Sequence, residues 1–247
     1  MTRVVWISGA SSGIGGAFAR ATPHADARII GISRRPSERG ETFTADLSNP
    51  ASWPTVARNF RQVLATSPEH ALFFHCAGVS DPVGPLAEVE SDAYTGAVLL
   101  NAASGQVLGQ AFIAACHHAG VAATLILCSS PAAARPTPGL THYSSGKAAM
   151  EMWVRGAALE QQRQGGAVDV YGVIPWAVDT PMVRSSGAVA RQDAPITVLL
   201  QEAIRRDRLA SPDSVASEIW AAVAVGVEPG TFVHVGAVSA HDPAPPV

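Results

Sequence analysis

Tyr143 and Lys147 are the two residues whose types and spacing most clearly predict chemistry. They stand four positions apart in a stretch of helical pattern, so their side chains share one helix face about a turn apart. A lysine ammonium lowers the pKa of a neighbouring phenol and can reach a ribose, and the phenol then serves as general acid or base for a carbonyl or alcohol oxygen. Lys147 is the only lysine among 17 basic residues, and a planar guanidinium would not fit such a contact.

Two further polar residues are candidates for the same reaction. Ser130 stands thirteen residues before Tyr143 at the end of an apolar run, where its hydroxyl could orient the substrate oxygen. Ser129, beside it, is expected to pack behind the site. Asn101 lies among apolar neighbours in a long helical stretch, and we expect it to distort that helix and hold a water near Lys147.

A glycine-rich loop joins the first predicted strand to the first predicted helix. Its glycines permit a tight turn and a close backbone approach, and the helix N-terminus offers free N–H groups to a pyrophosphate. A plain strand-to-helix turn would need one glycine rather than three. The residues predicted to cradle the nucleotide are Gly9, Ser11, Ser12, Gly13, Ile14 and Gly15.

The end of the second predicted strand indicates which dinucleotide binds. NAD sites place an acid there against the ribose, whereas NADP sites place arginine against the 2′-phosphate. Here the strand ends Ser33-Arg34-Arg35 with no acid before Glu38, which favours NADP. The alternative is that the two arginines are an ordinary solvated pair.

The third predicted strand is followed by Asp46 and Leu47. The carboxylate could accept a hydrogen bond from an adenine amino group. Because Ser48, Asn49 and Pro50 come next, it could equally serve turn chemistry.

Apolar runs of strand length alternate with helical patterns along the chain. We predict strands at 3–8, 27–33, 71–76, 122–129 and 168–174, with weaker ones at 42–45 and 231–235. We predict helices at 13–21, 51–65, 91–119, 144–164 and 213–227. This alternation is typical of an α/β fold, a doubly wound parallel sheet with helices on both faces.

The chain is predicted to form one domain over 1–240, followed by a loose tail at 241–247. The longest irregular stretch, about 175–210, is interpreted as a substrate lid, since α/β folds place such segments beyond the strand ends. Its apolar residues indicate an uncharged or aromatic substrate, although they could instead form a small core or an oligomer contact. They are Val178, Met182, Val183, Ile196, Val198, Leu199 and Leu200.

Composition excludes several functions for this chain of 247 residues. With 47% hydrophobic residues, a net charge of −3 and no basic run, we expect neither nucleic acid nor membrane as partner. The three cysteines form no metal or disulfide pattern, so we expect no metal site and a cytoplasmic location. His142, next to Tyr143, is interpreted as a solvated loop residue.

Taken together, the motifs resemble those of the short-chain dehydrogenase/reductases. They are Gly9-x-x-x-Gly13-x-Gly15, Asp46, Ala77-Gly78, Asn101, Ser130, Tyr143-x-x-x-Lys147, Pro175 and Asp179-Thr180-Pro181-Met182. The resemblance implies a seven-stranded Rossmann-type sheet and hydride transfer between nicotinamide and a small carbonyl or alcohol substrate. The resemblance implies that Tyr143 is the general acid/base and that Ser130 binds the substrate oxygen. It also implies that Lys147 lowers the pKa of the Tyr143 phenol and binds ribose, and that Asn101 anchors a proton-relay water.

The resemblance also assigns binding residues and an assembly. Further cofactor contacts are expected from Ser33, Leu47, Cys76, Ala77, Gly78, Tyr143, Lys147, Pro175, Val178 and Thr180. Substrate contacts are expected from Ser130, Tyr143, Trp176 and Met182. A homodimer or homotetramer is implied, and small residues of one helix could pack between subunits, namely Ala148, Ala149, Gly156, Ala157 and Ala158. The strand end at Arg34, the Asp179-Thr180 stretch and the closing 230–235 segment are most similar to the NADPH-dependent sepiapterin and benzil reductase branch.

Two departures from the family pattern stand out. The usual Asn-Asn-Ala-Gly is His75-Cys76-Ala77-Gly78, which removes two amide side chains. The usual Pro-Gly is Pro175-Trp176, so the indole could narrow the pocket, stack on a ring substrate or simply fill core space. The sequence therefore favours an NADP(H)-dependent ketone or diketone reductase. The alternative is a catalytically silent NADP(H)-sensing or scaffold protein, and a sugar-nucleotide epimerase is disfavoured.

Overall fold

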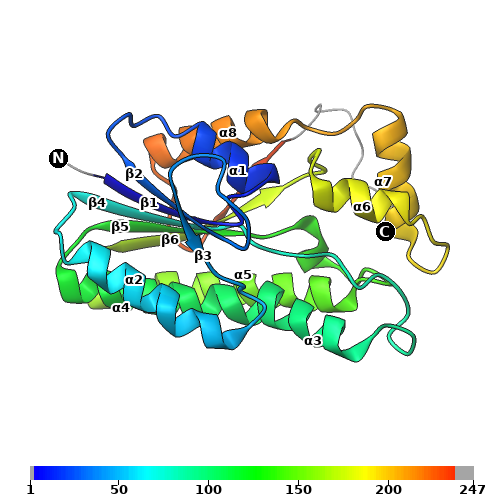
Figure 1. Ribbon diagram of the computed structural model, residues 1–247, viewed down its shortest axis with the longest axis horizontal. Coiled ribbons are helices and arrows are strands. Elements are labelled where there is room, and N and C mark those ends of the chain that lie inside the picture. The colour runs from blue at the N-terminus through cyan, green and yellow to red at the C-terminus, as the bar shows by residue number, and fades with distance from the viewer. Residues whose placement is uncertain (1–2, 237–247) are drawn as a thin grey trace.

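One parallel sheet of seven strands, in the order β3-β2-β1-β4-β5-β6-β7, organises the chain (Figure 1). The computed structural model describes residues 3–236, so the tail predicted to be loose at 241–247 lies outside the described residues. The strand order reverses between β1 and β4, and α/β sheets bind ligands at the carboxyl ends of the strands at such a point. The predicted doubly wound fold is confirmed.

Helices cover both faces of the sheet. The strands are β1 Arg3–Ser8, β2 Arg28–Ser33, β3 Glu41–Thr44, β4 His70–His75, β5 Ala123–Cys128, β6 Val168–Pro175 and β7 Phe232–Val235. The covering helices are α1 Gly13–Arg20, α2 Trp53–Leu64, α4 Ser104–Ala119, α5 Thr141–Gln164 and α8 Pro212–Val225. Helices α1 and α8 lie on one face, and α2, α4 and α5 lie on the other (Figure 1).

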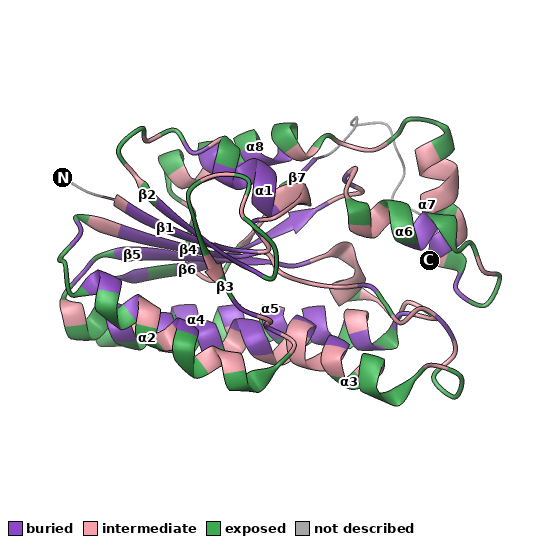
Figure 2. Cartoon of the chain, viewed as in Figure 1, coloured by how far each residue is buried: buried purple, intermediate pink, exposed green. Residues whose placement is uncertain are grey.

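The central strands are mostly buried (Figure 2), and apolar residues form a core cluster on each side of them. On the α2 and α4 side, the Trp6 ring meets the edge of Phe60 with centroids 5.3 Å apart. On the α1 and α8 side, Phe18 stacks on Trp220 at 4.2 Å. Strands buried on both faces need apolar residues at every position, which is why they appear as continuous apolar runs in the sequence.

The predicted helix at 91–119 contains a wide turn. Helix α3 (Ser91–Val98) continues through a π-helical turn at Leu99–Ala103 into α4, and Asn101 is buried in that turn. By length and a mean hydropathy of 1.3 this helix could cross a membrane. Its apolar residues Leu108 and Phe112 are buried in the core beside the sheet, so packing within the domain accounts for its composition.

The lid segment is more regular than expected. Within 175–210 the chain forms α6 (Pro181–Ala188) and α7 (Pro195–Arg205), each with proline in its first turn. The spacing of Ile196, Leu199 and Leu200 is a helical one, and this is the signal that predicts α7. The two helices pack together, since a Cβ on Gly187 would lie 2.7 Å from Ile204 Cδ1.

Candidate active site

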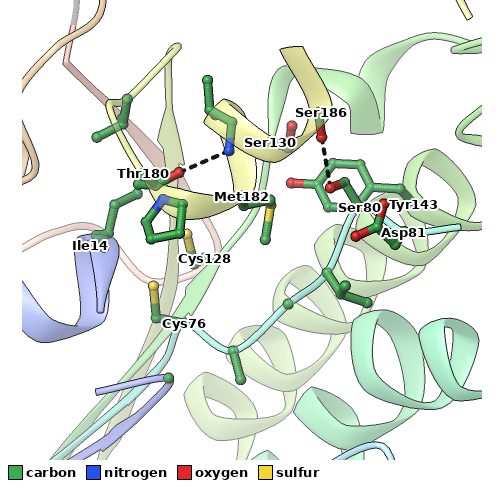
Figure 3. A pocket seen from close by; sticks show the side chains of 18 of the residues that line it. Ile14, Cys76, Ser80, Asp81, Cys128, Ser130, Tyr143, Thr180, Met182 and Ser186 are labelled. Carbon is green, nitrogen blue, oxygen red and sulfur yellow. Dashed lines mark hydrogen bonds between the residues drawn. The ribbon is translucent and has the colours of Figure 1, made fainter. Parts of the chain in front are cut away.

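A cavity of about 1110 Å³ follows the carboxyl ends of the strands. The glycine loop and the end of β2 line one part of it, and Tyr143, α6 and α7 line another. Figure 3 shows Ile14 of α1 on one side and Tyr143 on the other. The structure places every residue predicted to contact cofactor or substrate along this cavity. Of the predicted catalytic residues, only Asn101 lies behind its wall.

Backbone conformation shapes the glycine loop. Gly9 and Gly13 have φ angles of +73° and +56°, which residues other than glycine rarely adopt. A Cβ on Gly15 would lie 2.5 Å from the Gly9 carbonyl oxygen, so the loop closes tightly only with glycine there. Ser12 begins α1 without a capping hydrogen bond from its side chain, and the N–H groups of the first turn are therefore available to an anion.

The end of β2 presents two exposed guanidinium groups. Arg34 and Arg35 line the cavity, and the Ser33 hydroxyl donates a 2.5 Å hydrogen bond to the Arg35 carbonyl, which fixes the turn. Glu38 forms an ion pair with Arg20 of α1. Glu38, the first acidic residue after β2, is thus paired with Arg20 and does not neutralise Arg34 or Arg35.

Asp46 combines the two roles left open by the sequence. One oxygen, Oδ1, accepts from the Ser48 hydroxyl at 2.7 Å and from the Ser48 N–H at 3.0 Å, which is turn chemistry. The same residue lines the cavity. The bond from the Ser48 hydroxyl lowers the pKa of Asp46, with smaller contributions from the Ser48 N–H and the Arg34 charge, so the group is a carboxylate at neutral pH.

Helix α5 places the tyrosine and lysine as expected. Lys147 is buried, its Nζ donates a 2.7 Å hydrogen bond to the Cys128 carbonyl, and it lies 5.6 Å from the centre of the Tyr143 ring. Figure 3 shows Tyr143 and Ser130 at the same part of the cavity. The Ser130 hydroxyl accepts from the Ala132 N–H at 3.2 Å, at the start of a short 3₁₀ turn over Pro131–Ala134.

Ser129 also lines the cavity, so the two serines are distinguished by the contacts of their hydroxyl groups. Ser129 is buried, and its hydroxyl donates a 2.7 Å hydrogen bond to Glu151 of α5. Of the two serines that follow β5, Ser130 is therefore the one whose hydroxyl is placed for the cavity.

The π-helical turn directs the Asn101 side chain to the loop that follows β4. Its amide accepts from the Val79 N–H at 3.0 Å and donates to the Val79 carbonyl at 2.7 Å. A Cβ on Gly78 would lie 3.2 Å from Asn101 Oδ1 and 3.6 Å from Lys147 Nζ. The predicted distortion of the helix is present, and Asn101 holds the backbone beside Lys147 in place.

His75 makes two side-chain contacts at the position where the family pattern has the first of its two asparagines. Its Nδ1 lies 3.1 Å from the Ser8 hydroxyl and its Nε2 lies 3.2 Å from the Ser104 hydroxyl, which joins β1, β4 and α4. Ser8 in turn accepts from the N–H groups of Cys76 and Ala77, both at 3.0 Å. Burial lowers the pKa of His75 to about 3, with a smaller contribution from the Lys147 charge, so the ring is neutral.

His142 is buried and contacts the loop after β4, so its interpretation as a solvated loop residue is wrong. It lies in the first turn of α5, 2% exposed, with Nε2 3.1 Å from the Ser80 carbonyl. The Ser80 hydroxyl meets the Ser186 hydroxyl of α6 at 2.9 Å (Figure 3). Burial lowers the pKa of His142. A residue beside Tyr143 therefore connects the catalytic helix to the lid, and no motif predicts this connection.

Three predicted contact residues lie where β6 leads into the lid. Trp176 is half-buried and lines the cavity, and its ring lies 6.4 Å from that of His234. Thr180 caps α6 by accepting from the Val183 N–H at 3.3 Å (Figure 3). Val178 is 2% exposed and packs into the core beside α8, so it belongs more to the core than to the lid.

Over 3–236 no group of three or more His, Cys, Asp or Glu side chains could hold a metal.

Comparison with known proteins defines the class. The family model of the short chain dehydrogenases matches residues 3–190, and the chain belongs to this family. The chain is 25% identical over 232 residues to the benzil reductase ((S)-benzoin forming) of Bacillus cereus, covering 88% of this chain and 92% of that protein.

Two solved structures have the same fold. One is 4-hydroxyisoleucine dehydrogenase complexed with NADH, with a TM-score of 0.72 at 17% identity, covering 97% of this chain and 100% of that one. The other is a variant of actinorhodin polyketide ketoreductase with NADPH, with a TM-score of 0.76 at 18% identity, covering 95% and 96%. The protein is thus an oxidoreductase of a family that uses nicotinamide cofactors, and these two neighbours hold different ones.

Proposed function

We propose that this protein is an NADP(H)-dependent reductase of ketones or diketones with apolar or aromatic substituents. The observation that carries the proposal is the placement of Tyr143 and Lys147 on one helix, with Ser130 nearby, in the same cavity that the glycine cradle lines. A plain binding protein has no need of a buried ammonium beside an accessible phenol.

The residues present fit a nicotinamide dinucleotide. The glycine loop leaves no room for a Cβ at Gly15, and the α1 N-terminus offers N–H groups for a pyrophosphate. Asp46 lies on the adenosine side, and Lys147 can donate to ribose hydroxyls at the other end. The bound cofactor would supply the hydride.

NADP(H) is the proposed cofactor because of the charges after β2. Arg34 and Arg35 are exposed at the cavity edge, whereas Glu38 is paired with Arg20. Guanidinium groups bind phosphate strongly through paired N–H donors, so this edge suits a 2′-phosphate better than a bare ribose hydroxyl.

Tyr143 delivers the proton in the proposed reduction. Its Oη–H donates to the substrate carbonyl oxygen and transfers its proton as that oxygen gains charge. Ser130 donates a second hydrogen bond to the same oxygen, and the Lys147 ammonium places positive charge beside the phenol that has lost its proton. Asn101 keeps the turn beside Lys147 in place, and we assign it the anchoring of a water that returns the proton.

The walls of the cavity support the proposed substrate class. Trp176, Met182 and α7 residues Ile196, Leu199 and Leu200 surround the space beside Tyr143 with apolar surface. The relative from Bacillus cereus carries the name of a reductase of benzil, a diketone with two phenyl rings. Such a ring needs an apolar wall of this kind.

We also propose a cytoplasmic homo-oligomer. Helix α5 exposes Ala148, Ala149 and Gly156, with Met152 67% and Leu159 47% exposed beside them. Ala157 and Ala158, expected at a subunit contact, are buried within the chain instead because they face the core side of the helix. Free thiols at the three cysteines suit a reducing compartment.

A cofactor assay separates the reductase from a silent sensor. NADPH is incubated with the protein and a panel of diketones and aromatic ketones, and the reduced nicotinamide absorbance is followed. We expect its loss with at least one aromatic diketone. Tight NADPH binding with no oxidation by any compound would favour the sensor.

A further inference from the structure

Cys76 and Cys128 stand at the ends of neighbouring strands on the floor of the cavity. The register of β4 and β5 pairs His75 with Leu127, so the next positions along the two strands are these two cysteines. Neighbouring strands lie about 5 Å apart, which is within the Cα separation that a disulfide spans. Both cysteines line the cavity, and Figure 3 shows their sulfur atoms close to each other in its wall.

We propose that Cys76 and Cys128 form a modification site, a cross-strand dithiol that peroxides oxidise to a disulfide inside the cofactor cleft. The site is a property of the two strands and does not depend on the enzyme's substrate. Only its consequence, the loss of cofactor binding, rests on the proposed function.

The oxidation is a two-electron reaction with peroxide as the oxidant. One thiolate attacks a peroxide oxygen, the O–O bond breaks, and the sulfur becomes a sulfenic acid while the other oxygen leaves as water or an alcohol. The second thiol then attacks the sulfenic sulfur, the S–S bond forms, and water leaves with the proton of that thiol. The two sulfurs lose two electrons, and the peroxide bond gains them.

Cys116 of α4 gives an internal comparison. It lies in the core on the α2 and α4 side, and burial raises its pKa to about 12, so its thiolate is scarce. The hydrogen bond from Cys76 lowers the pKa of Cys128, and the Lys147 charge acts in the same direction. Of the two cavity thiols, Cys128 is thus the one that ionises more readily, whereas the hydrogen bond to Cys128 and burial raise the pKa of Cys76.

A disulfide here would act on the cofactor cradle. Ser8 holds the N–H groups of Cys76 and Ala77, and a Cβ on Gly9 would lie 3.2 Å from the Ala77 backbone. Drawing Cys76 toward Cys128 therefore moves the turn that packs against the glycine loop. On the other side, the Cys128 carbonyl accepts from Lys147.

The test oxidises the intact protein with hydrogen peroxide and measures its mass, its linked peptides and its NADPH affinity. We expect the loss of two hydrogens, one peptide pair joined through Cys76 and Cys128, NADPH binding weakened about tenfold or more, and full recovery with dithiothreitol. Bound NADPH should slow the reaction by covering the site.

Three serine variants complete the test. Cys76→Ser and Cys128→Ser should each abolish the linked peptide, whereas Cys116→Ser should leave it unchanged. Oxygen addition to single cysteines, a linkage through Cys116, or no oxidation at either strand end would overturn the site. A disulfide that leaves NADPH binding unchanged would overturn its effect on the cradle. None of the mass readouts needs turnover, so failure of the proposed reductase activity would be recognised separately.

Discussion

The two ends of the cavity are held in place by different means. At the nucleotide end, backbone conformation fixes the loop: Gly9 and Gly13 adopt positive φ angles, and Gly15 packs directly on the Gly9 carbonyl. From the end of β4 toward Tyr143, buried polar side chains hold the structure instead: His75 joins β1 and β4 to α4, and Asn101 holds the loop after β4.

This difference explains why the two ends tolerate change unequally. A glycine cradle admits few alternatives, because a Cβ would strike backbone that cannot move aside. Buried side-chain hydrogen bonds between two elements can be made by other residue types, provided that the same donors and acceptors are satisfied. The chain accordingly keeps the family's glycines and replaces its amide pair with His75 and Cys76.

Removing the Tyr143 hydroxyl should have the largest effect, and it should be confined to the catalytic end. Tyr143→Phe is expected to lower kcat/KM for ketone reduction by about 10²–10⁴-fold, because the proton donor is lost. NADPH affinity, measured by fluorescence titration, should stay within about twofold, since that end is held separately.

Tyr171 provides the matched control. Its hydroxyl is buried with no hydrogen-bond partner within the described part of the chain, so Tyr171→Phe should leave activity unchanged. Near wild-type turnover in Tyr143→Phe would remove this residue from the mechanism.

Removing His75 should destabilise the protein by about 2–4 kcal/mol, because Ser8 and Ser104 lose their partner and a cavity opens. Urea unfolding of His75→Ala measures this. His118→Ala, at an exposed position of α4, should change stability by less than about 0.5 kcal/mol. Equal stabilities of the two variants would contradict the role of His75.

The pH dependence of stability sharpens the same point. Burial lowers the pKa of His75 from its ordinary 6.5 to about 3. Between these values the unfolded chain binds a proton that the folded chain does not, so stability is lost as pH falls below 6.5. The loss from this one group approaches about 1.4 kcal/mol per pH unit. In His75→Ala the plot of unfolding free energy against pH should have a slope smaller by that amount below pH 6.5.

Reversing one charge after β2 should change cofactor choice at the nucleotide end alone. Arg34→Asp is expected to lower the preference for NADPH over NADH by about 10–100-fold, because a charged hydrogen bond to the 2′-phosphate is lost. Competition titrations with both cofactors measure it. Arg58→Asp, on the exposed side of α2, is the control, and an equal shift in both variants would contradict the cofactor argument.

The smallest expected effect concerns the link between lid and catalytic helix. Ser186→Ala removes the hydroxyl pair with Ser80, worth about 1 kcal/mol, and should raise KM for the ketone several-fold with kcat nearly unchanged. Steady-state kinetics checks this, with Ser185→Ala as control, because the exposed Ser185 hydroxyl donates to the Met182 carbonyl of the same helix. A fall in kcat with KM unchanged would contradict the lid role.

The sequence predicts the sheet and the motif residues well because each depends on local pattern. Continuous apolar runs reveal buried strands, and glycine spacing reveals the cradle. The side-chain contacts of His75 and His142 join residues that are at least 29 positions apart in the sequence. No local sequence pattern encodes such pairing. The sequence does not predict the lid helices for two different reasons: α6 carries no apolar repeat, and the repeat of α7 at Ile196, Leu199 and Leu200 is interpreted there as a substrate contact.

Transfer of deuterium from reduced cofactor to product tests the central claim most directly. NADPH labelled with deuterium at the nicotinamide C4 is incubated with the protein and benzil, and the product is examined by mass spectrometry. Hydride transfer predicts a hydroxyketone that carries one deuterium on its new carbinol carbon when the transferable face is labelled, and no deuterium when the other face is labelled. No product from benzil or from related aromatic diketones, or product without deuterium from either labelled cofactor, would contradict the account.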